Sequence, residues 1–121
     1  MSSYRIDQRR WEGLSFLEQM GNIGIEVDRA ISARRAADIE RADGALDRAV
    51  DLIDATVCCL VEQRSHRLRE LLLARNEFLR IFFEDASDTD VEDVDRYFMY
   101  FAVAAQCQRR ARRRGAPATA S

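Results

Sequence analysis

The sequence predicts an all-α protein, an antiparallel up-down-up-down four-helix bundle. Apolar residues repeat at intervals of three and four, and no stretch of strict apolar and polar alternation is long enough for a strand. The only proline, Pro117, lies close to the C-terminus. The chain has 121 residues, 47% hydrophobic and 33% charged, a balance typical of one globular domain. Short connections between four helical segments favour antiparallel neighbours.

The first predicted helix spans residues 8–36 and carries two adjacent apolar stripes. The stripes contain Leu17, Met20, Gly24, Val27 and Ile31, and Phe16, Met20, Ile23, Val27 and Ala30. Two stripes allow one helix to pack against two neighbours. Gly21 and Gly24 each lower helix propensity by about 1 kcal/mol relative to alanine. We therefore expect these glycines to mark close backbone approach by a partner helix, and Trp11 and Phe16 to close the end of the bundle.

The other three predicted helices span residues 39–62, 66–84 and 90–113. The second carries apolar residues at Ile39, Ala42, Leu46, Ala49, Ile53, Val57 and Leu60, and the fourth at Val91, Val94, Phe98, Phe101, Ala102 and Ala105. Together with Met20, Val27 and the two glycines, Phe98 and Phe101 are expected to form the helix-packing seam. The aromatic stripe of the fourth helix predicts a core or an oligomer interface, with a ligand pocket as the alternative.

Polar residues before three of these segments predict how the helices begin. Asp38 is a predicted N-cap, and Ser65 is a plausible cap for the third helix. Thr89, with Glu92 three residues later, matches a capping box.

Charge is distributed unevenly along the chain. All 19 basic residues are arginine, and the net charge is −2. Residues 109–121 contain five arginines and no acid, so they carry +5 and the rest of the chain −7. Residues 84–95 contain only acidic charges. We expect a bundle body over residues 1–108 and a basic, partly disordered tail over residues 109–121.

The arginines of the tail are the clearest signal for a partner. They are Arg109, Arg110, Arg112, Arg113 and Arg114. Such a cluster could neutralise several phosphates of a nucleic acid, although it has no aromatic residue for base stacking. Alternatively, it could contact the acidic segment of a neighbouring chain, or be a solvated helix C-terminus, where basic residues suit the helix dipole.

One sequence pattern begins with Trp11-x-x-Leu14-x-Phe16-Leu17-x-Gln19-Met20-x-Asn22-Ile23 and continues through Leu46-Asp47-Arg48-Ala49, Arg67-Leu68-x-Glu70-Leu71 and Tyr97-Phe98-x-x-Phe101-Ala102. Over most of the chain, this pattern resembles a family of small prokaryotic helical proteins without an assigned activity. This resemblance implies the helical-bundle fold. Gln19-x-x-Asn22-Ile23 is also similar to four-helix bundles of the ribosomal and retroelement-accessory type, which implies oligomers and roles linked to nucleic acid.

His66, the only histidine, allows two catalytic hypotheses to be tested. HEPN ribonucleases, which the chain loosely resembles, have an arginine five to seven residues before a histidine, but residues 59–61 are Cys-Leu-Val. A diiron bundle needs two Glu-x-x-His units. Glu62 and His66 could share a metal at helical spacing, but they straddle a predicted break. We expect a surface histidine, no cofactor and no metal.

Two further groups of residues have side chains that could carry chemistry. Polar residues of the first and third helices could converge, as an acid/base site or as a network that fixes helix register. They are Glu18, Asn22, Glu26, Glu70, Arg75 and Glu77. Cys58, Cys59 and Cys107 are expected to be reduced and mostly buried.

These patterns together predict a non-catalytic interaction or scaffold protein that forms a homo-oligomer, with a protein partner also conceivable. The alternative is a nucleic-acid-binding accessory subunit that uses residues 109–114, and a HEPN-like or metal-binding enzyme is disfavoured. The N-terminus is polar, and no apolar run approaches the roughly 18 residues of a membrane span. We therefore expect a cytoplasmic protein without a membrane partner.

Overall fold

The structure, a computed structural model, describes residues 6–115 and is all-helical over this range, as predicted. Its helices are α1 (Gln8–Glu12), α2 (Phe16–Arg35), α3 (Ile39–Glu62), α4 (Leu68–Phe83) and α5 (Asp88–Arg113). The described part of the chain thus has five helices, where the sequence predicted four. Residues 109–113 of the predicted tail belong to α5, and the predicted disordered end over residues 116–121 lies outside the described residues.

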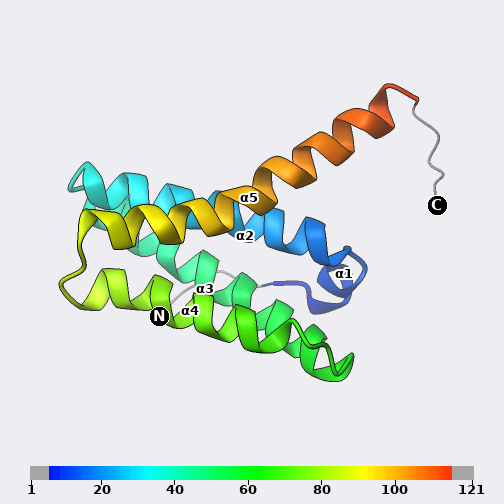
Figure 1. Ribbon diagram of the computed structural model, residues 1–121, viewed down its shortest axis with the longest axis horizontal. Helices are drawn as coiled ribbons and strands as arrows, with labels where there is room; N and C mark the ends of the chain where they lie inside the picture. The colour runs from blue at the N-terminus through cyan, green and yellow to red at the C-terminus, as the bar shows by residue number, and fades with distance from the viewer. Residues whose placement is uncertain (1–5, 116–121) are drawn as a thin grey trace.

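The long helices reverse direction from one to the next (Figure 1). Helix α2 packs most extensively against α3 on one side and α5 on the other, whereas α4 has much sparser contacts with α3 and α5. The C-terminal end of α5 extends away from the rest of the molecule (Figure 1). Helix α5 therefore has one tightly packed side and a long exposed side.

The prediction of one helix over residues 8–36 is wrong, because the helix breaks after Glu12. Gly13 is the C-cap of α1, and Ser15 is the N-cap of α2. Ser15 Oγ accepts a hydrogen bond from Glu18 N at 3.1 Å, while Ser15 N donates to Glu18 Oε1 at 2.9 Å. These bonds form a reciprocal capping box, which satisfies backbone donors that a helix start leaves unpaired.

The short helix α1 is held against α3 by buried polar contacts. Trp11 is buried, and its Nε1 donates to Thr56 Oγ1 at 3.0 Å. Gln19 Nε2 donates to the Trp11 carbonyl oxygen at 2.9 Å. Buried polar groups are costly unless they are hydrogen-bonded, so these bonds stabilise the folded-back position of α1. Phe16, which was expected to close the bundle end with Trp11, is half-buried.

The predicted caps are correct in one of three places. Asp38 is the N-cap of α3, and its carboxylate accepts from Arg41 N at 3.2 Å. Helix α5 begins earlier than predicted, because Ser87 rather than Thr89 is its N-cap. Ser65 Oγ accepts from Arg67 N at 3.1 Å, but α4 starts after Arg67, which makes no side-chain capping bond.

The glycines of α2 lie where α5 comes closest. A Cβ atom added at Gly21 would lie 2.8 Å from the Ala105 Cβ atom, and one added at Gly24 would collide with the carbonyl oxygen of Phe98. Only a residue without a side chain fits at such a separation. Met20 and Val27 are fully buried beside these glycines.

The core lies on both sides of α2 and extends to α4. Its largest fully buried side chains are Phe78, Phe98, Met20, Ile23, Ile31, Ile53, Leu60, Leu71, Ile81 and Val27. Helix α4 is anchored by Phe78, whose ring packs edge-on against Phe98 at a centroid distance of 6.1 Å. Because α4 contributes few fully buried residues, its junction with α5 stays open to solvent.

Candidate functional site

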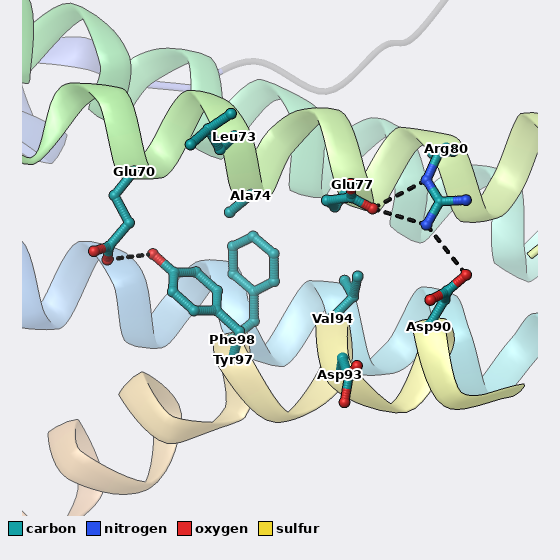
Figure 2. A pocket seen from close by; sticks show the side chains of 10 residues that line it. All are labelled: Glu70, Leu73, Ala74, Glu77, Arg80, Asp90, Asp93, Val94, Tyr97 and Phe98. Atoms are coloured by element: carbon teal, nitrogen blue, oxygen red, sulfur yellow. Dashed lines mark hydrogen bonds and ion pairs between the residues drawn. The ribbon is translucent and has the colours of Figure 1, made fainter. Parts of the chain in front are cut away.

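A cleft of about 480 Å³ lies between α4 and α5 (Figure 2). Its apolar lining consists of Leu73, Ala74, Val94 and Phe98, and its polar lining of Glu70, Glu77, Arg80, Asp90, Asp93 and Tyr97. The polar lining is strongly acidic, since Arg80 is its only basic residue. An apolar cleft with a charged rim is the kind of surface that binds another molecule.

Arg80 joins the two helices at one end of this cleft. Its Nη2 atom lies 2.9 Å from Glu77 Oε2 on its own helix and 3.2 Å from Asp90 Oδ2 on α5 (Figure 2). Hydrogen bonds to Glu77 and Asp90 raise the pKa of Arg80, and the bond from Arg80 lowers the pKa of Asp90. These charges are already paired with one another, so they form a polar clasp, an ion-pair network that links α4 to α5.

Tyr97 and Glu70 join the two helices at the other end of the cleft. The Tyr97 hydroxyl donates to Glu70 Oε1 at 2.9 Å (Figure 2). Burial, followed by the bond to the Glu70 carboxylate, raises the pKa of Tyr97. The phenol therefore stays protonated at neutral pH and acts as a donor. The Tyr97 ring continues into the core against Phe98 at a centroid distance of 5.0 Å.

Large apolar side chains of α4 and α5 are exposed, and one of them, Leu73, lines the cleft. They are Leu72, Leu73, Phe83, Tyr100 and Val103, with exposed fractions from 40% to 72%. Single exposed apolar residues are common on monomers, but several on two neighbouring helices favour an interaction surface.

The predicted packing residues of α5, Phe98 and Phe101, lie where this helix packs against α2. Phe98 is fully buried, whereas Phe101 is half-buried and packs edge-on against Phe16 at a centroid distance of 6.0 Å. Both meet α2 along the line of Gly21 and Gly24. The contact with α2 is close at the two glycines, while Phe98 also lines the α4/α5 cleft and Phe101 the hollow beside His66.

The arginine cluster lies at the end of α5 that leaves the molecule (Figure 1). Arg109, Arg110, Arg112, Arg113 and Arg114 are all exposed. Arg112 Nη1 lies 3.9 Å from Glu18 Oε2, a loose ion pair at the start of α2. The exposed positions leave the guanidinium groups accessible to phosphates or carboxylates from outside.

The polar cluster considered from the sequence does not assemble. Its members have separate partners: Glu26 pairs with Arg29 and Arg48, Glu70 with Tyr97, Arg75 with Asp54, and Glu77 with Arg80. Asn22 is exposed, and Glu18 belongs to the capping box. The capping bond from Ser15 N lowers the pKa of Glu18. The structure therefore contradicts a shared acid/base site among these residues.

His66 is exposed in the connection between α3 and α4, where it lines a surface hollow of about 580 Å³ with Ser15, Phe16 and Tyr100. Within residues 6–115, His, Cys, Asp and Glu nowhere gather in a group of three that could hold a metal ion. The expectation of mostly buried cysteines is wrong, since Cys59 is buried but Cys58 and Cys107 are exposed. All three are free thiols.

Two carboxyl groups, Asp28 of α2 and Asp95 of α5, form a pair that the sequence did not predict. Burial and then the neighbouring Asp28 raise the pKa of Asp95 to about 6, while Arg35 acts in the opposite direction. Among the described residues, the buried Asp95 Oδ1 atom has no hydrogen-bond partner. Nothing in the local sequence signals this pair, because its members are far apart in the chain.

Comparison of the chain with protein-family models, curated proteins and solved structures gave no match. The resemblances seen in the sequence thus stay predictions. None of the helices within residues 6–115 has the length and apolar character needed to cross a membrane.

Proposed function

We propose that this protein is a non-catalytic helical interaction protein that assembles with further copies of itself in the cytoplasm. Its four long helices serve as a bundle-like scaffold, and α4 and α5 supply the contact surface. The observation that carries this proposal is the open α4/α5 cleft, together with the exposed apolar side chains of these two helices. Surfaces of this kind bury apolar area when a partner covers them.

The state of the polar groups supports a binding role over a catalytic one. Arg80 is paired with Glu77 and Asp90, and Tyr97 with Glu70. A general acid or base must be able to reach a substrate proton. Groups that are committed to one another across two helices instead hold the cleft at a fixed width.

Light scattering coupled to size-exclusion chromatography tests this proposal. We expect a protein-only peak with a multiple of the 13.9 kDa chain mass, at both low and high salt. A peak with the chain mass at every concentration tested would contradict self-assembly.

The second candidate function is that of a nucleic-acid-binding accessory subunit. It is supported by the exposed arginine cluster at the free end of α5. Binding through phosphates would weaken steeply with salt, because each neutralised phosphate releases counterions. The same chromatography would then show a peak with high absorbance at 260 nm that loses it in high salt.

A truncated chain that ends at Gln108 separates the two functions. For the accessory subunit, truncation should abolish binding to a fluorescent single-stranded or duplex oligonucleotide while the helical circular dichroism persists. A matched full-length variant with glutamine in place of the five arginines keeps the helix and removes the charge. Unchanged oligonucleotide binding by that variant would exclude the cluster as the site.

A further inference from the structure

Helix α5 has a second stripe of residues that no part of the described chain covers. The stripe consists of Asp93, Arg96, Tyr100, Val103, Cys107, Arg110 and Arg114, all of which are exposed. Their spacing alternates between three and four residues, the repeat by which a helix packs along its length against another helix. The same helix already uses a different stripe, which includes Val94, Phe98 and Ala102, to pack against the core.

The chemistry of this outer stripe is graded from one end to the other. Its centre is apolar, with Tyr100 67% exposed and Val103 55% exposed. Asp93 lies near its start, where it is paired with Arg96 at 3.0 Å, and Arg110 and Arg114 lie at its end. The acidic charge beside the start of the stripe comes from Asp88, Asp90 and Glu92 in the first turns of α5. A helix with an apolar centre, an acidic end and a basic end is complementary to a second copy of itself only in the antiparallel orientation.

We propose that the outer stripe of α5 packs antiparallel against the α5 of a second copy and so forms a two-fold dimer. The inference rests on the proposed self-assembly and names the surface that makes it. The best register pairs Tyr100 with the second copy's Val103, and Arg96 with the second copy's Cys107. In that register Asp93 faces the second copy's Arg110, and two-fold symmetry repeats each contact.

The α4/α5 cleft fits this arrangement. Asp90 and Asp93 of α5 lie on its rim with Glu77 of α4. The same register brings the arginine-rich end of each copy's α5 beside the acidic first turns of the other copy's α5. Helix α5 can reach a neighbour because its C-terminal end leaves the molecule (Figure 1). Opposite charges across an interface fix its orientation and exclude wrong registers.

A charged residue at the centre of the stripe tests the proposal. Val103→Asp should convert the assembly to single chains in light scattering, because it places two carboxylates in the centre of the interface. Val61→Asp on α3 is the matched control, since Val61 is 54% exposed and lies outside the stripe. Circular dichroism checks that both variants remain helical.

The outcomes separate this inference from the proposed function. If Val103→Asp alone dissociates the assembly, the stripe is the interface. If the wild type assembles and the Val103→Asp protein has the same assembled mass, the stripe is not the interface. The inference is then overturned, while the proposed self-assembly stands. A wild type that is a single chain contradicts both. If both valine variants dissociate, the effect is not specific to the stripe, and the inference is again overturned.

Disulfide formation tests the orientation of the pair. In a Cys58→Ser background, Arg96→Cys should form an intermolecular disulfide with Cys107 under mild oxidation, because these positions face each other. The two Cys107 residues would be roughly 16 Å apart along the helix axis, too far for a bond. The Cys58→Ser protein without the added cysteine is the control. A Cys107–Cys107 disulfide in that control would indicate a parallel pair and overturn the register.

Discussion

Helix α5 meets α2 on one side and α4 on another, and the two contacts are built differently. Against α2 it presents Ala102, Ala105 and the backbone of Phe98 to Gly21 and Gly24, so that the two helices come close. Against α4 it leaves a cleft of about 480 Å³ that is spanned by polar clasps. Close packing without voids stabilises a fold, whereas an open apolar cleft remains available to a partner. The comparison shows that α5 is close-packed on one side and open on another, and the proposed interaction uses the open part.

The largest effect on stability is expected from a large side chain placed in the close contact between α2 and α5. Gly24→Leu would force α2 and α5 apart, because even a Cβ atom collides with the Phe98 carbonyl oxygen. We expect a loss of at least about 3 kcal/mol in the free energy of unfolding, measured by urea denaturation. Gly44→Ala is the matched control. Its added Cβ would lie 3.5 Å from Arg48 Nη1, an ordinary contact, so it should stabilise α3 by about 0.5–1 kcal/mol. Equal stability of the Gly24→Leu protein and the wild type would contradict the close-approach account.

A smaller, pH-dependent effect is expected from the carboxyl pair on the same side of α5. The folded protein retains the Asp95 proton up to a pKa of about 6, whereas the ordinary pKa of an aspartate is 3.8. The folded state therefore binds more protons than the unfolded state within this range, and stability falls as pH rises through it. Asp95→Asn stays neutral and should be about 1–2 kcal/mol more stable than the wild type at pH 7, less than the full shift because Asp95 is incompletely buried.

Thermal unfolding at pH 4 and pH 7 measures this effect. The two proteins should have similar stability at pH 4 and diverge by pH 7. Asp43→Asn, an exposed change on α3, controls for the loss of one negative charge. If the control reproduces the gain at pH 7, burial of Asp95 is not the cause.

The smallest effect on stability is expected at the open contact between α4 and α5. Tyr97→Phe removes the hydrogen bond to Glu70 and keeps the ring that packs against Phe98. Because Glu70 is exposed and can bind water instead, we expect a loss of only about 0.5–1 kcal/mol in urea denaturation. A loss as large as that of Gly24→Leu would show that the α4/α5 contact contributes to the fold as much as the closed one does.

Local patterns in the sequence predicted much of the close α2/α5 contact, the closed side of α5. They predicted little of the α4/α5 contact, its open side. Helical periodicity identified Met20, Val27 and Phe98 as core residues, because it reports which face of a helix is buried. The break before Ser15 was also encoded locally, as a serine followed by glutamate three residues later. It was missed because the apolar repeat continues across the break.

The clasps of the open side depend on contacts between distant segments. Arg80 and Asp90 lie on different helices, as do Glu70 and Tyr97, and periodicity does not determine which polar residues will meet. The outer stripe of α5 is visible in the sequence as a second repeat through Tyr100 and Val103. Only the structure shows that this repeat faces solvent.

Hydrogen exchange at low and high protein concentration tests most directly whether the open side is the interaction side. The account predicts that assembly slows amide exchange in α4 and in the C-terminal half of α5, while exchange in α1 and α3 stays unchanged. Slowing confined to α1 or α3, or exchange that does not respond to concentration, would contradict it.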